Sequence, residues 1–152
     1  MYRATRDDPL TKRLAFLGKE IHEEFAAMLA EHGCTMPTWA VLFQVHRNRG
    51  LSQVQLAAHI GIEGPTLARH LDRLTADGLV ERHRDPLDRR ILRVALTPEG
   101  QRRWEELKDV RSQFEDRLTH GLSDEQRAVL DAAIDHIHRA LEDAHDLIHT
   151  DR

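Results

Sequence analysis

Apolar residues recur at steps of three and four from Leu10 to Met28. This period predicts an amphipathic helix over about residues 8–31, and Gly33 is expected to end it because glycine is favoured just past a helix C-terminus. A second apolar segment begins near Pro37 and predicts another helix, which ends in a run of histidine, arginine and asparagine.

Two short helices are expected in the middle of the chain. Ser52 and Gln55 have the S-x-x-Q spacing of a capping box, which predicts a helix start, and Gly61 is expected to end that helix. Pro65 marks the next start, because the fixed φ of proline suits the first helical position, and Gly78 marks its end. Two short helices with a tight break between them predict a helix-turn-helix.

The pattern then changes from the helical period to short apolar runs. Residues 79–82 and 91–96 each predict a β-strand, and the polar residues 85–90 between them include a proline and two arginines. Together these segments predict a β-hairpin with an arginine-bearing tip.

Two more helices are expected after the hairpin. Thr97, followed by a proline, is an N-cap candidate, and Gly121 is expected to end the helix that it opens. Ser123 and Gln126 repeat the capping-box spacing and open the last helix. The apolar positions of that helix recur near the 3.5-residue period of a coiled coil, and they are Leu130, Ile134, Ile137, Leu141, Ala144 and Ile148.

The order of these elements predicts a mainly α fold with a small β-hairpin wing. Residues 35–97 are expected to form a winged helix-turn-helix, and the N- and C-terminal helices, in residues 1–34 and 98–152, a helical dimerisation region. The apolar stripes of the first and last helices are too long for the small central domain to cover. Because monomers rarely expose such large apolar patches, we expect a homodimer.

Charge is distributed unevenly along the chain. The net charge is −4 and the isoelectric point is about 6.2, which on average disfavours a nucleic-acid partner, since non-specific DNA affinity comes from neutralised phosphates. Seven arginines nevertheless lie between Arg69 and Arg93, whereas acidic residues gather after residue 100. A basic centre with acidic ends fits a protein that touches phosphate with its middle.

The cellular compartment is suggested by what the sequence lacks. Its one cysteine, Cys34, excludes an intrachain disulfide. The N-terminus has no apolar core of a signal peptide, and no apolar stretch is long enough to span a membrane. A cytoplasmic protein without a membrane partner is expected.

The second short helix of the helix-turn-helix has two chemically different faces on a helical wheel of about 100° per residue. Arg69 and Arg73 fall on one face, flanked by Pro65, Thr66 and Asp72. The two guanidinium groups can pair with guanine in the major groove. The opposite face consists of Leu67, Leu71 and Leu74. Without the wing that follows, two arginines on a helix would more readily be read as ordinary solvated surface.

The predicted wing tip carries Arg89 and Arg90, and arginine is attracted into a narrow minor groove by its negative potential. The neighbouring Asp88 can hold a guanidinium in one orientation. The alternative is a charged hairpin whose tip only keeps it soluble.

At this point the chain resembles a known family. Residues 88–100 match the motif D-x-R-x-x-x-V-x-L-T-x-x-G of the MarR family of regulators, and residues 60–69 and 74–82 are similar to that family's helix-turn-helix, closest to its SlyA-like branch. The resemblance covers nearly the whole chain. It implies that Arg69 enters the major groove, that Arg90 enters the minor groove, and that Asp88 orients Arg90.

The resemblance also implies an effector. Members of the family more often sense small aromatic or phenolic anions, in a cleft between the dimerisation arm and the DNA-binding lobe. The candidate lining here is Arg13, Leu17, Trp39, Phe43 and His70, because an arginine among apolar rings could pair with a carboxylate. The alternative is that Trp39 and Phe43 are simply core residues.

Other sensing chemistry finds less support. His145 and His149 have the i, i+4 spacing of a metal pair on a helix, and Cys34 lies near His32, but no third ligand is evident beside either pair. Relatives that sense oxidants use a cysteine in the first helix, whereas Cys34 follows that helix and is expected to be inert. We therefore expect no cofactor and no metal.

The sequence thus predicts a transcriptional regulator that binds duplex DNA at an inverted-repeat operator, as a repressor relieved by a ligand. No motif of nucleophilic, phosphate-binding or zinc-dependent catalysis occurs, so an enzyme is not expected. The alternatives are a winged-helix module that binds protein, with a merely solvated wing, and a metal-sensing regulator of the same fold.

Overall fold

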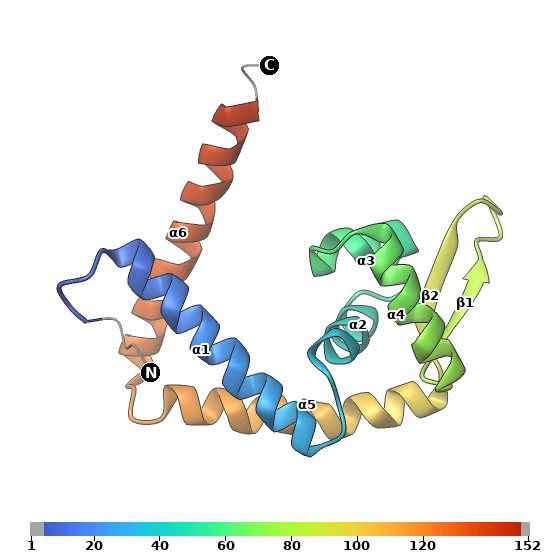
Figure 1. Ribbon diagram of the computed structural model, residues 1–152, viewed down its shortest axis with the longest axis horizontal. Coiled ribbons are helices and arrows are strands. Elements are labelled where there is room, and N and C mark those ends of the chain that lie inside the picture. Colours follow the sequence, from blue (N-terminus) through green and yellow to red (C-terminus); the bar gives the residue numbers. More distant parts are fainter. Residues whose placement is uncertain (1–4, 150–152) are drawn as a thin grey trace. The chain divides into compact units, whose positions relative to one another are not determined.

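The computed structural model describes the backbone of residues 5–149 and the side chains of residues 5–143. Its helices and strands are α1 (Leu10–Glu31), α2 (Met36–Arg47), α3 (Gln53–Ile60), α4 (Gly64–Ala76), β1 (Val80–Arg84), β2 (Leu92–Leu96), α5 (Pro98–Thr119) and α6 (Asp124–His149) (Figure 1). The chain divides between Gln113 and Phe114 into two compact units. The predicted mainly α fold with one small hairpin is confirmed.

Both predicted capping boxes are formed. The Ser52 hydroxyl accepts a hydrogen bond from the Gln55 N–H at 3.2 Å, and the Gln55 side chain accepts one from the Ser52 N–H at 2.9 Å. Ser123 and Gln126 exchange the same pair of bonds at the start of α6. These bonds satisfy backbone donors that the first turn of a helix otherwise leaves open, so local sequence fixes where α3 and α6 begin.

The core of the first unit lies between its helices and the hairpin. Leu67, Leu71 and Leu74 are buried on one side of α4, as the helical wheel predicts. They share this core with buried apolar residues of other elements, namely Leu29, Val41, Leu42, Leu56, Val80, Val94 and Leu107. This apolar contact orients α4 so that its opposite side faces outward.

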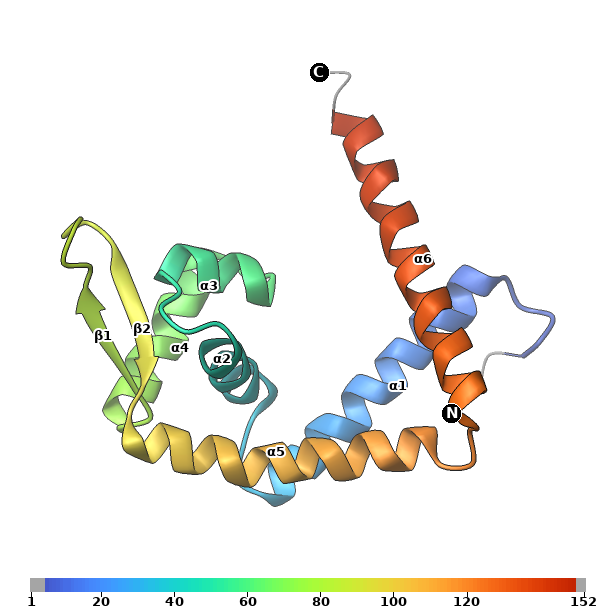
Figure 2. The ribbon, with the colours of Figure 1, turned by 180° about the vertical axis from the view of Figure 1, so that it is seen from behind.

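The wing is an antiparallel pair in which Val80 lies opposite Leu96 and Arg84 opposite Leu92. The two strands run side by side next to α4 in both views (Figures 1 and 2). β1 extends two residues beyond the predicted strand, because the pairing continues to Arg84. β2 is also joined to the loop after α2, where the Val94 N–H donates to the Leu51 carbonyl at 3.1 Å. The strand β2 is therefore hydrogen-bonded on both of its edges, to β1 on one and to the loop after α2 on the other.

The junction of the wing with α5 explains the motif glycine. The Thr97 hydroxyl caps α5 by accepting from the Gly100 N–H at 3.0 Å, and it donates to the Gly78 carbonyl at 2.5 Å. A Cβ at Gly100 would lie 1.9 Å from the carbonyl oxygen of Leu79. Only glycine allows the first turn of α5 to approach this backbone so closely.

Large apolar side chains are exposed on the first half of α1 and along α6. On α1, Leu10, Leu14 and Leu17 are exposed, and on α6 so are Val129, Leu130, Ile134 and Leu141. The predicted stripe positions Ala144 and Ile148 lie outside the described side chains. None of the helices in the described part of the chain is both long and apolar enough to cross a membrane.

Candidate nucleic-acid interface

The outward side of α4 carries the arginines predicted to read DNA. Arg69 and Arg73 are exposed and Thr66 is half-buried, whereas the leucines on the other side are 0–2% exposed. The Arg69 Nε donates a long bond of 3.5 Å to the Pro65 carbonyl, which leaves most of its guanidinium open to other partners. No acidic residue occupies the first turn of α4. Pro65 has no N–H and the Thr66 N–H donates to the Glu63 carbonyl at 3.0 Å, so it is mainly the helix dipole that favours an anion there.

A carboxylate on the same helix is already paired. Asp72 accepts from the Arg82 Nη2 at 2.7 Å, and this ion pair joins α4 to β1. The wheel placed Asp72 beside the arginines, and the structure directs it to the wing. The pair holds the helix and the hairpin together.

The wing tip presents Asp88, Arg89 and Arg90, all exposed. The Asp88 carboxylate accepts from the backbone N–H of Arg90 at 2.9 Å, and no ion pair joins the two side chains in the described part of the chain. The Arg84 Nη1 donates to the Arg89 carbonyl at 2.6 Å. Asp88 thus acts on the backbone that carries Arg90, and this bond is the geometric basis for the orienting role, which stays a prediction.

Asp85, at the base of the wing, is not among the residues predicted from the sequence. Its buried carboxylate accepts from the backbone N–H groups of Leu87 at 2.7 Å and Asp88 at 3.0 Å, and from the Arg93 Nε. Arg93 also donates to the Gly50 carbonyl. The Arg93 hydrogen bond, helped by the two N–H groups, holds the pKa of Asp85 below its ordinary value.

The network of Asp85, Arg93 and the Gly50 carbonyl ties the wing turn to β2 and to the loop after α2. We call these three groups the wing clamp. The Asp-Pro pair at residues 85–86 is a turn signal that could have pointed to Asp85. Its partner Arg93 has no such local signal.

A groove of about 460 Å³ lies between the wing and the two short helices. Arg90, Ile91 and Leu92 line it from the wing, Gly64 from the start of α4, and Ser52, Gln53 and Val54 from the start of α3. The side-chain oxygen of Gln53 is buried without a hydrogen-bond partner in the described part. The structure therefore brings Arg90 and the N-terminus of α4 to one groove, which Arg69 and Arg73 do not line.

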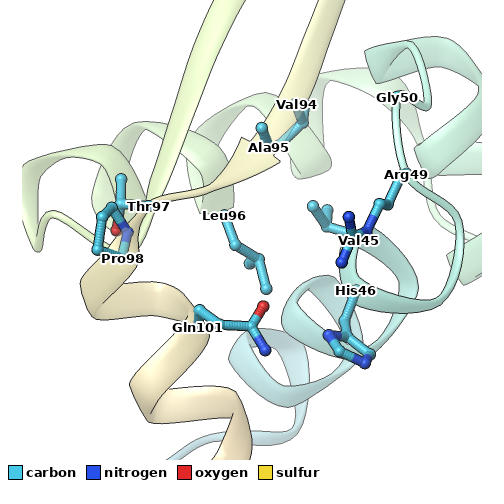
Figure 3. A pocket seen from close by; sticks show the side chains of 10 residues that line it. All are labelled: Val45, His46, Arg49, Gly50, Val94, Ala95, Leu96, Thr97, Pro98 and Gln101. Carbon is cyan, nitrogen blue, oxygen red and sulfur yellow. The ribbon is translucent and has the colours of Figure 1, made fainter.

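The predicted effector residues are dispersed over three helices. Arg13 and Leu17 are exposed on α1, and His70 is half-buried on α4. Trp39 and Phe43 stack on α2 with ring centroids 5.1 Å apart and an interplanar angle of 13°. The indole N–H of Trp39 is buried without an acceptor in the described part. These residues line neither the groove beside Arg90 nor a second pocket, of about 400 Å³, whose lining includes Val45, His46 and Arg49 (Figure 3), so the effector cleft stays a prediction.

The structure shows the environment of Cys34 and His32, for which the sequence predicted neither a metal site nor a redox role. Cys34 is buried, and burial raises the pKa of its thiol against the opposing effect of Arg103. A ring nitrogen of His32 lies 2.9 Å from the Met28 carbonyl. Within the described side chains, no three His, Cys, Asp or Glu residues gather to hold a metal ion. The side chains of His145 and His149 lie outside them.

Known proteins share both the central sequence and the fold. Residues 32–91 match the MarR family. The transcriptional regulator PA3341 has a TM-score of 0.80 and 29% identity, over 89% of this chain and 99% of that one. The transcriptional repressor CouR, bound to a 23-mer DNA duplex, has a TM-score of 0.78 and 28% identity, over 90% of this chain and 97% of that one.

A mutant of MarR from E. coli, complexed with operator DNA, has a TM-score of 0.75 and 25% identity, over 85% of this chain and 93% of that one. These proteins share the winged helix together with the flanking helices. Residues 32–91 are thus similar to the MarR family, and the chain has the winged-helix fold of solved MarR-type transcriptional regulators.

Proposed function

We propose that the protein is a cytoplasmic, sequence-specific regulator that binds duplex DNA as a homodimer and represses transcription until a small ligand binds. The observation that carries this proposal is that arginines lie on the exposed side of α4 and in the groove at the start of the same helix. Arg69 and Arg73 lie on the side of α4 opposite its buried leucines, and Arg90 lines the groove at the start of the same helix. The SlyA-like branch remains an interpretation of the motifs.

In this proposal α4 enters the major groove. Arg69 and Arg73 can form bidentate hydrogen bonds with guanine, and Thr66 lies near the same end of the helix. The N-terminal end of α4 can attract a backbone phosphate through the helix dipole, since the first turn holds no carboxylate. These contacts would combine base reading with phosphate positioning.

The wing would enter the adjacent minor groove with Arg90, while Arg89 binds a neighbouring phosphate. Asp88 would shape the turn through its bond to the Arg90 N–H, and the wing clamp would fix the base of the hairpin. An arginine held by an ordered turn loses less freedom on insertion, so the minor-groove contact gains affinity.

A homodimer is supported by the exposed apolar side chains of α1 and α6. Leu17 is 51% exposed and Leu141 is 66% exposed in the single chain. Burial of such side chains against a second copy is favourable, at roughly 25 cal/mol per Å² of apolar surface. Two copies of α4 related by a twofold axis would read an inverted repeat. Light scattering at micromolar concentration should give the dimer mass, and a monomer mass would refute the assembly.

Relief by a ligand is supported by the chemistry around Trp39. Its buried indole N–H has no acceptor among the described residues, and the neighbouring Phe43 supplies an apolar ring. A small aromatic or phenolic anion could accept this hydrogen bond, and Arg13, Leu17 and His70 stay the predicted further lining. CouR, named a transcriptional repressor, supports repression as the sign of regulation.

The decisive experiment selects bound sequences from a random duplex pool, using the full chain. We expect an inverted repeat, and binding to it that weakens steeply with salt because released counterions drive association. Arg69→Ala with Arg73→Ala should abolish the enrichment. A chain that enriches no sequence, and that instead binds a protein with little salt dependence, would overturn the proposal in favour of a protein-interaction module.

A further inference from the structure

Leu87 is the most exposed large apolar side chain in the part of the chain that the structure describes. It is 97% exposed, and Val54 follows at 80%. The other exposed large apolar side chains lie on α1, at or just after the end of α5, and on α6, where the proposed homodimer would bury apolar surface. Leu87 instead belongs to the loop between β1 and β2 (Figure 1). Its exposure therefore calls for a different partner.

Hydrogen bonds hold the backbone around Leu87. The buried Asp85 carboxylate accepts from the Leu87 N–H at 2.7 Å and from the Asp88 N–H at 3.0 Å. The Asp85 N–H donates to the Ile91 carbonyl at 2.9 Å and closes the loop. Pro86 fixes φ immediately before Leu87. The loop thus presents an apolar side chain without covering it, and its backbone has little freedom left to lose on binding.

The neighbours of Leu87 indicate which surface it meets. Arg89 and Arg90 are exposed and follow within three residues on the same loop. A single exposed leucine is common on protein surfaces and by itself indicates nothing. Beside two cations on a hydrogen-bonded loop, however, it would meet a partner that is both anionic and partly apolar. The minor groove of duplex DNA is such a surface, because phosphates border it and deoxyribose rings form its walls.

We propose that Leu87 is a further DNA contact, whose side chain packs against the deoxyribose walls of the minor groove that Arg90 enters. This inference rests on the proposed function. The contact removes apolar surface from water and neutralises no phosphate, so its contribution to affinity is independent of salt. Leu87 stays outside the base stack, because a wedge between bases kinks the duplex toward the major groove, whereas Arg90 favours a narrow minor groove.

The test measures the affinity of Leu87 variants for the operator selected by the natural chain, over a salt series. Leu87→Ser should weaken binding about three- to tenfold at every salt concentration, as expected when part of the burial of one leucine is lost. Leu87→Met is the matched control, because it keeps an apolar side chain of similar volume, and it should bind within about twofold of the natural chain. Since Leu87 is exposed, neither variant should change the Tm.

Two further measurements separate this contact from other kinds of binding. Leu87→Ser should keep the natural slope of log K against log salt concentration, whereas Arg89→Gln should make the slope shallower by about 0.9, the value for one phosphate contact. The fluorescence of 2-aminopurine in the operator flank should not rise when the natural chain binds, because the bases stay stacked. A rise that Leu87→Ser removes would overturn packing on the sugar walls in favour of a wedge.

Three other results would overturn the contact. Equal operator affinity of Leu87→Ser and the natural chain would do so and leave the proposed function standing. A shallower salt slope for Leu87→Ser would show that the change acts through a phosphate contact. A changed mass of DNA-free Leu87→Ser in light scattering would assign Leu87 to an interface with a second copy. A natural chain that enriches no DNA sequence would overturn the proposed function and this contact together.

Discussion

Replacing Gly100 with alanine should destabilise the junction between the wing and α5. The new Cβ would lie 1.9 Å from the Leu79 oxygen and 2.9 Å from its carbonyl carbon. Because relaxed carbon–oxygen contacts are about 3.3 Å, the two segments must separate by more than about 1 Å. The same Leu79 carbonyl accepts from the Thr97 N–H at 3.2 Å, so the separation also strains that hydrogen bond.

The change in the free energy of unfolding combines two destabilising contributions and one stabilising contribution. Overpacking typically costs about 1–3 kcal/mol, and a weakened hydrogen bond adds about 1 kcal/mol. Alanine in a helix offsets roughly 0.5–1 kcal/mol relative to glycine. The net destabilisation of Gly100→Ala is therefore about 1–3 kcal/mol. For a chain of this size it should lower the Tm by about 3–10 °C.

The assay is thermal unfolding of the full chain followed by circular dichroism, with Gly64→Ala as the matched control. Gly64 begins α4, and a Cβ there would meet no atom within 4 Å. Its Tm should stay equal to that of the natural chain or rise slightly. A Tm for Gly100→Ala within about 1 °C of the natural chain would refute the steric reasoning, since 1 °C corresponds to less than about 0.5 kcal/mol.

Three further predictions concern DNA binding. Asp85→Asn should weaken binding most at operators with A·T-rich flanks. Because the folded chain lowers the pKa of Asp85, the ionised carboxylate contributes fully to wing order above its ordinary pKa. In a pH titration of the natural chain, this contribution should be lost only as the pH falls through the lowered pKa. Arg69→Ala should cost about 1–3 kcal/mol on the selected operator and much less on random DNA in gel shifts, whereas equal losses would show phosphate contact alone. Asp88→Ala should loosen operator binding despite removing a negative charge, as Arg90→Ala also should. Tighter binding by a folded Asp88→Ala dimer would contradict the orienting role.

Much of the fold was legible from the sequence because its signals are local. A capping box joins two residues that are three positions apart, so Ser52 and Ser123 predicted the starts of their helices without any tertiary context. The leucine spacing in α4 identified its buried side, since a helix repeats every 3.6 residues. The hairpin was predicted from two apolar runs around an Asp-Pro turn, although its first strand proved longer because pairing with β2 continues to Arg84.

The candidate interface could be predicted only in part from the sequence. Arg69 and Arg73 could be placed on the outward side of α4 from the wheel alone. Whether Asp72 faces DNA or the wing depended on where β1 lies, and its partner Arg82 became known only from the folded arrangement. The sequence also left open which group the Asp88 carboxylate binds, because a short acidic side chain in a turn can bond either to a guanidinium or to the backbone.

The sequence by itself determined the helices, the wing and the positions of the exposed arginines, because each depends on residues within a turn or two of one another. Only the tertiary structure decided the wing clamp, where Arg93 binds a carbonyl 43 residues earlier in the chain. It likewise decided the close approach at Gly100 and the pocket beside Arg49. Such features arise where segments distant in sequence meet, and no periodicity encodes that meeting, since it depends on how the whole core packs.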